Sequence, residues 1–264
     1  MDDIAYYKLE KQPLLFVLAE FRFPDVLKID KFVPDVQECL REQLPYFEEQ
    51  QSQKLTLQPD GINITAVPRY VFTNKLQQQA VVLESNRLFC VSSVYNRFDG
   101  FKSFCSKTLR IIEDIIHPSA LQRLGLRFAD LVMDDTTGAD ITSYVNFDIS
   151  YHAHLESIGT LVRKASEFVF QTTEGHMTIR TLYGSHNLSV LPDVGQLPIK
   201  LPEVASFASK RIILDFDHVW ESMTRDEDIN FSAPHIVDKL NGLHALSREC
   251  FWNIVTKEGL QSWK

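Results

Sequence analysis

Two aspartates in the segment LDFDHVW, Asp215 and Asp217, have the types and spacing that could do chemistry. The segment is typical of a β-strand, so both carboxylates should lie on one face of a sheet, with Phe216 and His218 on the other. Paired carboxylates can hold a divalent cation through hard oxygen ligands, and Glu221 is the nearest third acid. The pattern favours a simpler alternative, a strand face on which the aspartates pair with arginines.

Histidines offer a second possible metal site. His152 and His154 share one face of a predicted strand, which is a geometry that zinc sites use. No third ligand follows at a recognisable spacing, so an exposed edge with two histidines is the simpler interpretation. His244 lies on the apolar side of the last predicted helix, and we predict a hydrogen-bonded core residue there.

Arg22 and Arg127 are the most informative charges, because each interrupts an apolar run. Both are followed directly by a phenylalanine and three residues later by an aspartate. A buried arginine must be paired, since an unpaired interior charge costs several kcal/mol. Glu20, on the same strand face as Arg22, is one candidate partner. The structural interpretation is an ion pair that joins sheet and helix; the functional one is an arginine that lines a cleft and binds an anion bidentately.

Hydrophobic periodicity places these residues in two similar halves. Each half is predicted to run from an apolar strand through a helix and antiparallel strands to a long amphipathic helix. The first contains a strand at 14–23, a helix with Pro34 in its first turn, strands between 46 and 93, and a helix at 99–116 capped by Asp99. The second contains a strand at 121–133, a short helix at 141–145, an extended segment at 151–158, strands at 164–172, 176–183 and 211–220, and helices opened by Pro234 and capped by Thr256.

The two arginines are 127 − 22 = 105 residues apart, which is about the size of one domain. We therefore predict an α+β fold of two tandem β-α-β-β-β-α units, 1–118 and 119–264, with antiparallel sheets and helices packed on one face. The sequence leaves open whether the two sheets merge or pack face to face. The proline-rich loop at 189–202 is long for a compact domain, which favours a functional or mobile role.

Composition excludes several classes of protein. The formal net charge of -8, without a basic cluster, argues against nucleic-acid binding. The start of the chain has no apolar core typical of a signal peptide, and no apolar run approaches the ~20 residues of a membrane helix. Four cysteines without a CxxC pair suit reduced thiols in a cytoplasmic protein. The common nucleotide-binding, serine hydrolase and zinc protease motifs are absent from the sequence, and we expect no cofactor.

Six short sequence segments, in order along the chain, resemble those of a protein family. They are PLLFVLAEFRFP, VYNRFDGF, RLGLRFADL, FQTTEGHMTIR, LDFDHVWE and LHALSRECFWNIVTKEGLQSW. Together they are similar to a sporadically distributed bacterial family known only by a numbered placeholder name. The resemblance implies a soluble protein of this length from accessory genes, such as those of phage defence or toxin–antitoxin modules. It assigns no catalytic role to the matching residues, which are Arg22, Tyr95, Phe98, Arg127, Thr173, Gly175, Asp215, Asp217, His244, Phe251, Thr256 and Trp263.

Three functional hypotheses follow. The first, which we favour, is a non-enzymatic binding or regulatory protein that acts on a protein partner, for example one encoded by a neighbouring gene. The sequence leaves open whether the chain also forms a homodimer. Trp220 and Trp252 could anchor that partner, although core packing is the simpler use for them. The second is a metal-dependent hydrolase or nuclease that uses Asp215 and Asp217. The third is an anionic small-ligand module with a pocket between sheet and helices, gated by Arg22 or Arg127.

Overall fold

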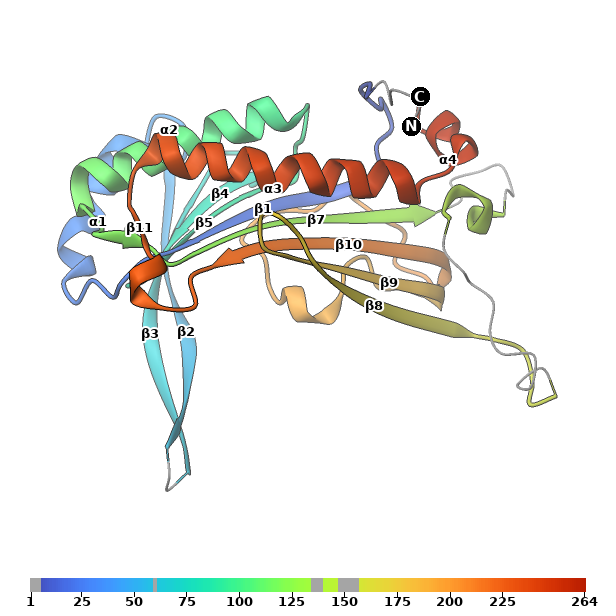
Figure 1. Ribbon diagram of the computed structural model, residues 1–264, viewed down its shortest axis with the longest axis horizontal. Helices are drawn as coiled ribbons and strands as arrows, with labels where there is room; N and C mark the ends of the chain where they lie inside the picture. Colours follow the sequence, from blue (N-terminus) through green and yellow to red (C-terminus); the bar gives the residue numbers. More distant parts are fainter. Residues whose placement is uncertain (1–5, 59–60, 134–139, 147–156) are drawn as a thin grey trace.

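A computed structural model shows one large antiparallel sheet as the framework of the molecule (Figure 1). It describes residues 6–58, 61–133, 140–146 and 157–264, without the side chains of 52–58 and 62–64. Over these ranges the sheet has nine strands, in the order β2-β3-β4-β5-β1-β7-β10-β9-β8. Their bounds are β1 (Leu14–Arg22), β2 (Tyr46–Gln58), β3 (Gly61–Thr73), β4 (Gln79–Leu83), β5 (Arg87–Ser92), β7 (Arg123–Met133), β8 (Arg163–Gln171), β9 (His176–His186) and β10 (Ser209–Glu221).

The remaining elements are helices and one small two-stranded sheet. The α-helices are α1 (Ile29–Leu40), α2 (Phe98–Ile116), α3 (Ala233–Ile254) and α4 (Lys257–Ser262). The short strands β6 (Ala120–Leu121) and β11 (Ile229–Asn230) pair with each other. Single turns of 3₁₀ helix are η1 (Ile141–Tyr144), η3 (Pro192–Val194) and η4 (Arg225–Glu227).

Strands β1 and β7 lie side by side at the centre of the sheet and join the two halves of the chain. They run antiparallel, with Val17 opposite Phe128 and Arg22 opposite Arg123. Their nearly continuous apolar runs suit this position, because a central strand is covered on both faces. β5 is the other neighbour of β1, and β10 is the other neighbour of β7. The two predicted sheets therefore merge into one.

Helices α2 and α3 cover one face of the sheet, here called the helical face (Figure 1). Between these layers, Phe21 of β1, Leu109 of α2, Leu124 of β7 and Leu240 of α3 are each fully buried in one core cluster. Burying a leucine or phenylalanine side chain contributes about 1.5–3 kcal/mol, so this interface is a main source of stability. Because its residues come from both sides of the central strand pair, the core belongs to both halves of the chain.

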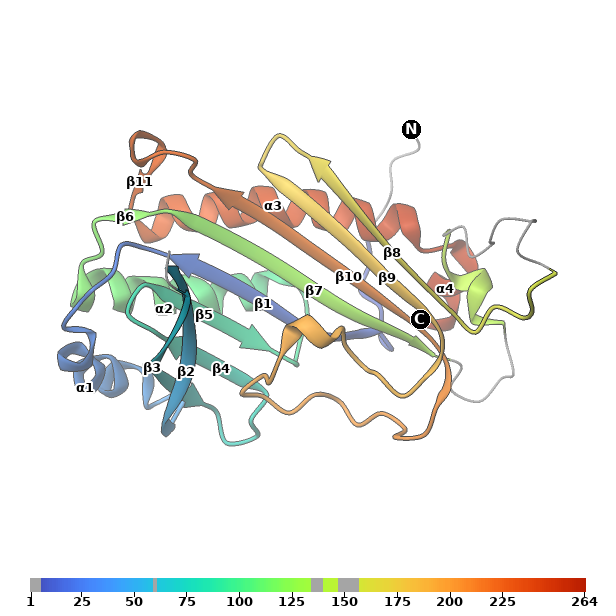
Figure 2. The same cartoon turned by 90° about the horizontal axis from the view of Figure 1, so that it is seen from below.

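The opposite face of the sheet, here called the second face, is partly covered by the loop 187–208 (Figure 2). Ile199 of this loop is buried in a cluster that includes Ile213 of β10. Arg211, which is fully buried, holds the loop by donating to the backbone carbonyls of Leu188 at 3.2 Å and Phe207 at 2.9 Å. The loop that the sequence marked as functional or mobile is thus packed onto the sheet.

The α+β class with a large antiparallel sheet is confirmed, while several predicted boundaries are wrong. α1 begins at Ile29, so Pro34 lies inside the helix rather than in its first turn. α2 begins at Phe98 after Arg97, so Asp99 lies in the first turn and does not cap the helix. Strands β2 and β3 form one long hairpin that projects from the sheet, instead of several shorter strands (Figure 1).

The second half departs from the predicted unit between β7 and β8. In the part of this connection that the structure describes, the 3₁₀ helix η1 takes the place of the expected α-helix. Residues 134–139 and 147–156 lie outside the described ranges, and so does most of the predicted extended segment from 151. The tandem unit and the domain boundary at 118 therefore stay predictions. Among the described residues, no helix combines the length and apolar character needed to cross a membrane.

Candidate functional site

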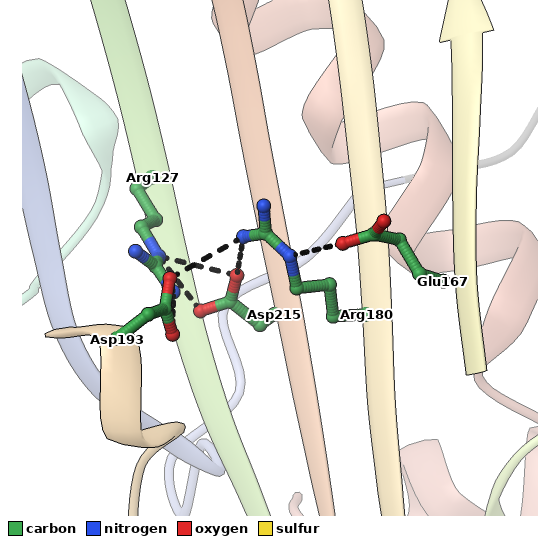
Figure 3. Close-up of polar contacts among 5 residues, drawn as sticks. All are labelled: Arg127, Glu167, Arg180, Asp193 and Asp215. Atoms are coloured by element: carbon green, nitrogen blue, oxygen red, sulfur yellow. Dashed lines mark hydrogen bonds and ion pairs between the residues drawn. The ribbon is translucent and has the colours of Figure 1, made fainter. Parts of the chain in front are cut away.

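Charged side chains form a row across β7, β10, β9 and β8 on the second face (Figure 3). Arg127 Nε donates to both carboxylate oxygens of Asp215, at 2.9 and 3.1 Å, and Arg127 Nη2 binds Asp193 of the loop 187–208 at 3.0 Å. Arg180 Nη1 approaches Asp215 at 3.5 Å, while its Nε binds Glu167 at 2.7 Å. This row arises from strand alternation, which brings every second residue of neighbouring strands to one face.

Burial dominates the electrostatics of this row. Burial raises the pKa of Asp215 to about 6, and the guanidinium groups of Arg127 and Arg180 only partly offset that rise. The pKa of Asp217 is also raised by burial, against the pull of Arg127 and Arg123. The two aspartates share one face as predicted, but Asp215 is fully buried rather than solvated. The row is therefore an ion network that is buried at Asp215 and exposed at Asp193 and Glu167.

The same geometry speaks against the metal site that the sequence offered as the alternative to pairing with arginines. Both oxygens of Asp215 accept from Arg127, so the positions that a cation would occupy are taken by guanidinium nitrogens. Glu221, the expected third ligand, instead pairs with Arg123 at 3.0 Å and Arg22 at 3.6 Å. Within the described part of the chain, no three His, Cys, Asp or Glu residues gather as a metal site would require. His152 and His154 lie outside the described residues.

Arg22 belongs to a second cluster on this face, centred on Glu20. The predicted Glu20–Arg22 pair is present at 3.5 Å, and Glu20 also binds Arg123 at 3.0 Å and Arg87 at 3.9 Å. The expectation that Arg22 and Arg127 link the sheet to a helix is wrong, because their partners come from neighbouring strands and the loop 187–208. Alternation along β1 and β7 turns both arginines away from the helices.

A pocket of about 460 Å³ lies on the helical face. Its floor comes from the sheet and includes Phe128, Asp130 and Phe216. Its walls come from residues 95–99 before and within the first turn of α2, from α3 between Asn241 and Trp252, and from the N-terminal segment 6–14. The third functional hypothesis placed a pocket between sheet and helices, and one is present there. Arg22 and Arg127 do not line it, so neither can gate it.

Aromatic rings dominate the walls. The rings of Phe98 and His244 stack in parallel with centroids 3.6 Å apart, and Tyr95 meets Phe128 edge to face at 5.9 Å. Trp252 makes edge contacts with Tyr6 at 5.5 Å and Tyr7 at 5.0 Å. The predicted hydrogen-bonded core role of His244 is wrong: it is half-buried, lines the pocket, and among the described residues makes ring contacts and no hydrogen bond. Burial lowers its pKa to about 3, so the ring is neutral.

Asp130 is the unusual residue of the floor. Asp130 is only 4% exposed, yet it lines the pocket. No described residue makes a hydrogen bond or ion pair to its carboxyl group. Burial, aided by the charge of Asp215, raises the pKa of Asp130 to about 8. Because Asp130 lines the pocket and no described residue bonds to its side chain, this carboxyl is open to a hydrogen bond from a molecule in the cavity.

The rim of the pocket is basic. Lys8, Arg97 and Arg248 are exposed and line it, and in the described ranges none of them forms an ion pair. Arg248 lies over the ring of Tyr6, with its guanidinium carbon 4.0 Å from the centroid. The other charged pair of the lining, Lys102 and Asp99, is joined at 2.9 Å. Among the described residues, three cations without an ion-pair partner therefore line a cavity whose carboxyl groups are Asp99, paired with Lys102, and the buried Asp130.

The two predicted partner anchors lie in different places. Trp220 is half-buried, with the Lys239 ammonium 4.5 Å from the centre of its ring, and it packs against the main core. Trp252 lines the pocket mouth beside Tyr6 and Tyr7. Sequence reasoning missed Asp130, Tyr95 and Arg248 as site residues. The available signal was an aspartate inside the apolar run GLRFADLVM, where an ionised carboxylate is costly.

Compared with protein-family models and with curated proteins, the chain matches none. The resemblance to a placeholder-named bacterial family therefore stays a prediction, and the site must be interpreted from its geometry.

Proposed function

We propose that this chain is a non-enzymatic regulatory protein that binds a small organic ligand in the pocket over Asp130. One observation carries the proposal: a buried carboxyl with no partner among the described residues faces a cavity walled by aromatic rings. Ligand sites are typically cavities of roughly 300–1,000 Å³ with mostly apolar walls and a few placed polar groups, and this pocket fits that description. A ligand that bonds to Asp130 would give this carboxyl the hydrogen bond that no described residue supplies.

The N-terminal segment supports a regulatory role, because it forms one wall and is held by few polar contacts. Gln12 donates to the backbone carbonyl of Tyr95, and the Lys11 amide donates to the carbonyl of Trp263 at 3.0 Å. Tyr6 and Tyr7 contribute rings that meet Trp252. A bound ligand adds contacts to this wall and thereby changes the population in which the segment is docked. The surface presented to a partner protein then depends on occupancy.

The partner protein, the cytoplasmic location and the setting among bacterial accessory genes remain part of this proposal. So does the origin of the fold as a duplicated unit. Supporting the duplication, β1 and β7 are antiparallel neighbours, and each pairs on its outer side with the strand that precedes a long helix, β5 before α2 and β10 before α3. The occupied ion network on the second face gives the metal-dependent hydrolase no comparable support.

Ligand binding can be tested without knowing the ligand. The full chain purified from its native host is compared by native mass spectrometry before and after denaturing desalting, and its Tm is measured with and without a small-molecule extract. We expect a retained mass or an extract-dependent rise in Tm. The Ala245→Trp variant, which fills the pocket mouth, should lose both effects, because Ala245 lines the cavity.

Asp238→Trp is the matched control, since Asp238 is exposed on the same helix and does not line the pocket. It should keep both effects. A protein with no retained mass and no extract-dependent shift, or an Ala245→Trp variant that keeps both, would remove the basis for the proposal. The partner is then sought by affinity purification with and without the extract, and a partner captured equally in both conditions contradicts regulation by occupancy.

A further inference from the structure

The inner part of the pocket selects for a ligand with hydrogen-bonding atoms on a flat ring. Asp130 stands between aromatic groups, with Phe128 two residues before it on the same strand face and Tyr95 above Phe128. A purely apolar ligand would leave the carboxyl unpaired, which is the most costly arrangement for a buried polar group. A flat ring with donors and acceptors on its edge satisfies the carboxyl while its faces contact the aromatic walls.

The protonation of the inner groups adds to this selection. With its pKa raised to about 8 by burial, Asp130 is a neutral acid at pH 7 that offers one donor and one acceptor. The pKa of Tyr95 is raised by burial and then by Asp130, so its hydroxyl keeps its proton. The neutral ring of His244 offers one donor and one acceptor as well. Groups that both donate and accept can complement the mixed donors and acceptors on the edge of a nucleobase.

The outer part of the pocket selects for an anion. Lys8, Arg97 and Arg248 have no ion-pair partner among the described residues, and all three line the cavity. α2, a helix of 19 residues, begins at Phe98 beside Arg97, and its first turn has no side-chain cap. Free backbone N–H groups at a helix start attract negative charge, and phosphate is a common occupant. A cationic or amine ligand would meet repulsion from all of these groups.

We propose that the pocket binds a nucleoside monophosphate, with its base against Asp130 and the aromatic floor and its phosphate between Arg97, Arg248 and the start of α2. This inference rests on the proposed ligand-binding function and adds the chemical class of the ligand. The cavity volume of about 460 Å³ suits one ligand of this size rather than a longer nucleic acid. A divalent cation is not required, because the rim supplies positive charge from side chains.

The test is calorimetric titration of the full chain with AMP, GMP, CMP and UMP, with their nucleosides, and with inorganic phosphate. At least one monophosphate should bind tenfold or more tightly than its nucleoside, and phosphate alone should bind weakly. Arg248→Ala and Arg97→Gly should each lower the affinity for that monophosphate about tenfold and leave the nucleoside affinity unchanged. Arg110→Ala, a change at an exposed arginine of α2 outside the pocket, should alter neither affinity.

Asp130→Leu, close in shape and apolar, should lower the affinity for both nucleoside and monophosphate at least tenfold. If that variant fails to fold, the exposed Arg97 and Arg248 variants still decide the phosphate position. Binding of no monophosphate at millimolar concentration, or equal affinity for nucleoside and monophosphate, overturns the inference. A Tm shift with the metabolite extract but with none of these compounds overturns the ligand class and leaves the ligand-binding function standing.

Discussion

Asp215 shows how much one side chain holds together on the second face. It is fully buried and accepts from Arg127 and Arg180, which come from two neighbouring strands. Asp215→Ala removes the buried partner that they share, and we expect a loss of about 2–3 kcal/mol in the free energy of unfolding, because among the described residues Arg127 then keeps only its ion pair with the half-exposed Asp193. Urea denaturation measures this loss. Glu167→Ala removes an exposed partner of Arg180 and should cost less than about 1 kcal/mol; equal losses in the two variants would contradict a buried network.

Asp130 makes the free energy of unfolding fall as the pH rises from about 4 towards 8. Below about pH 4 its carboxyl is protonated in both the folded and the unfolded chain, so it adds no difference. From there towards pH 8 the unfolded chain ionises while the folded chain, with the pKa raised to about 8, holds its proton. The free energy of unfolding therefore falls through this window. Asp215, across the sheet, and Tyr95 interact electrostatically with Asp130.

Asp130→Asn should remove this fall, because the amide does not ionise. The stability of the variant relative to the parent protein should rise between pH 4.5 and pH 7.5, as measured by urea denaturation at both values. Asp215, whose pKa is also raised, titrates in both proteins and cancels in the comparison. If the difference in the free energy of unfolding between Asp130→Asn and the parent protein stays constant with pH, Asp130 ionises normally in the folded chain.

At the scale of elements, the turn between β8 and β9 depends on a residue without a side chain. Gly175 has a φ of +148°, and a Cβ atom there would lie 2.1 Å from the backbone oxygen of Val219. Gly175→Ala should therefore cost more than about 2 kcal/mol in unfolding free energy. Gly100→Ala is the matched change: it lies in α2 with open space around it, and should stabilise by up to about 1 kcal/mol. Thermal unfolding distinguishes the two, and a tolerated Gly175→Ala would contradict this close approach.

Element-level patterns predicted much of this fold. Alternation correctly placed Asp215 and Asp217 on one face of their strand, and periodicity found α2 and α3, because each pattern depends on nearest neighbours along one element. The pocket could not be predicted in this way. Asp130, Tyr95 and Arg248 are far apart in the chain and meet only after β7, the start of α2 and α3 have packed together. The sequence of residues 6–14 has no hydrophobic periodicity that would predict its place in the pocket wall.

At the scale of the whole molecule, the two halves should unfold together, because the core between sheet and helices draws on both. All three tryptophans lie after residue 219, and the buried Cys90 and Cys105 lie before residue 119. Tryptophan fluorescence and the thiol reactivity of the buried cysteines should therefore give the same urea midpoint. Separate midpoints would show that the chain divides into independently folding domains, as its predicted boundary at 118 would allow.

Arg97 carries a backbone conformation, φ 145° and ψ 161°, that is almost confined to glycine. Such a conformation costs on the order of 1–3 kcal/mol in a residue with a Cβ atom. Replacing Arg97 by glycine should thus make the protein harder to unfold while it removes one cation of the proposed phosphate site. Selecting variants for thermal resistance alone would drift towards that replacement and produce a sturdier protein with a weakened version of the proposed phosphate site.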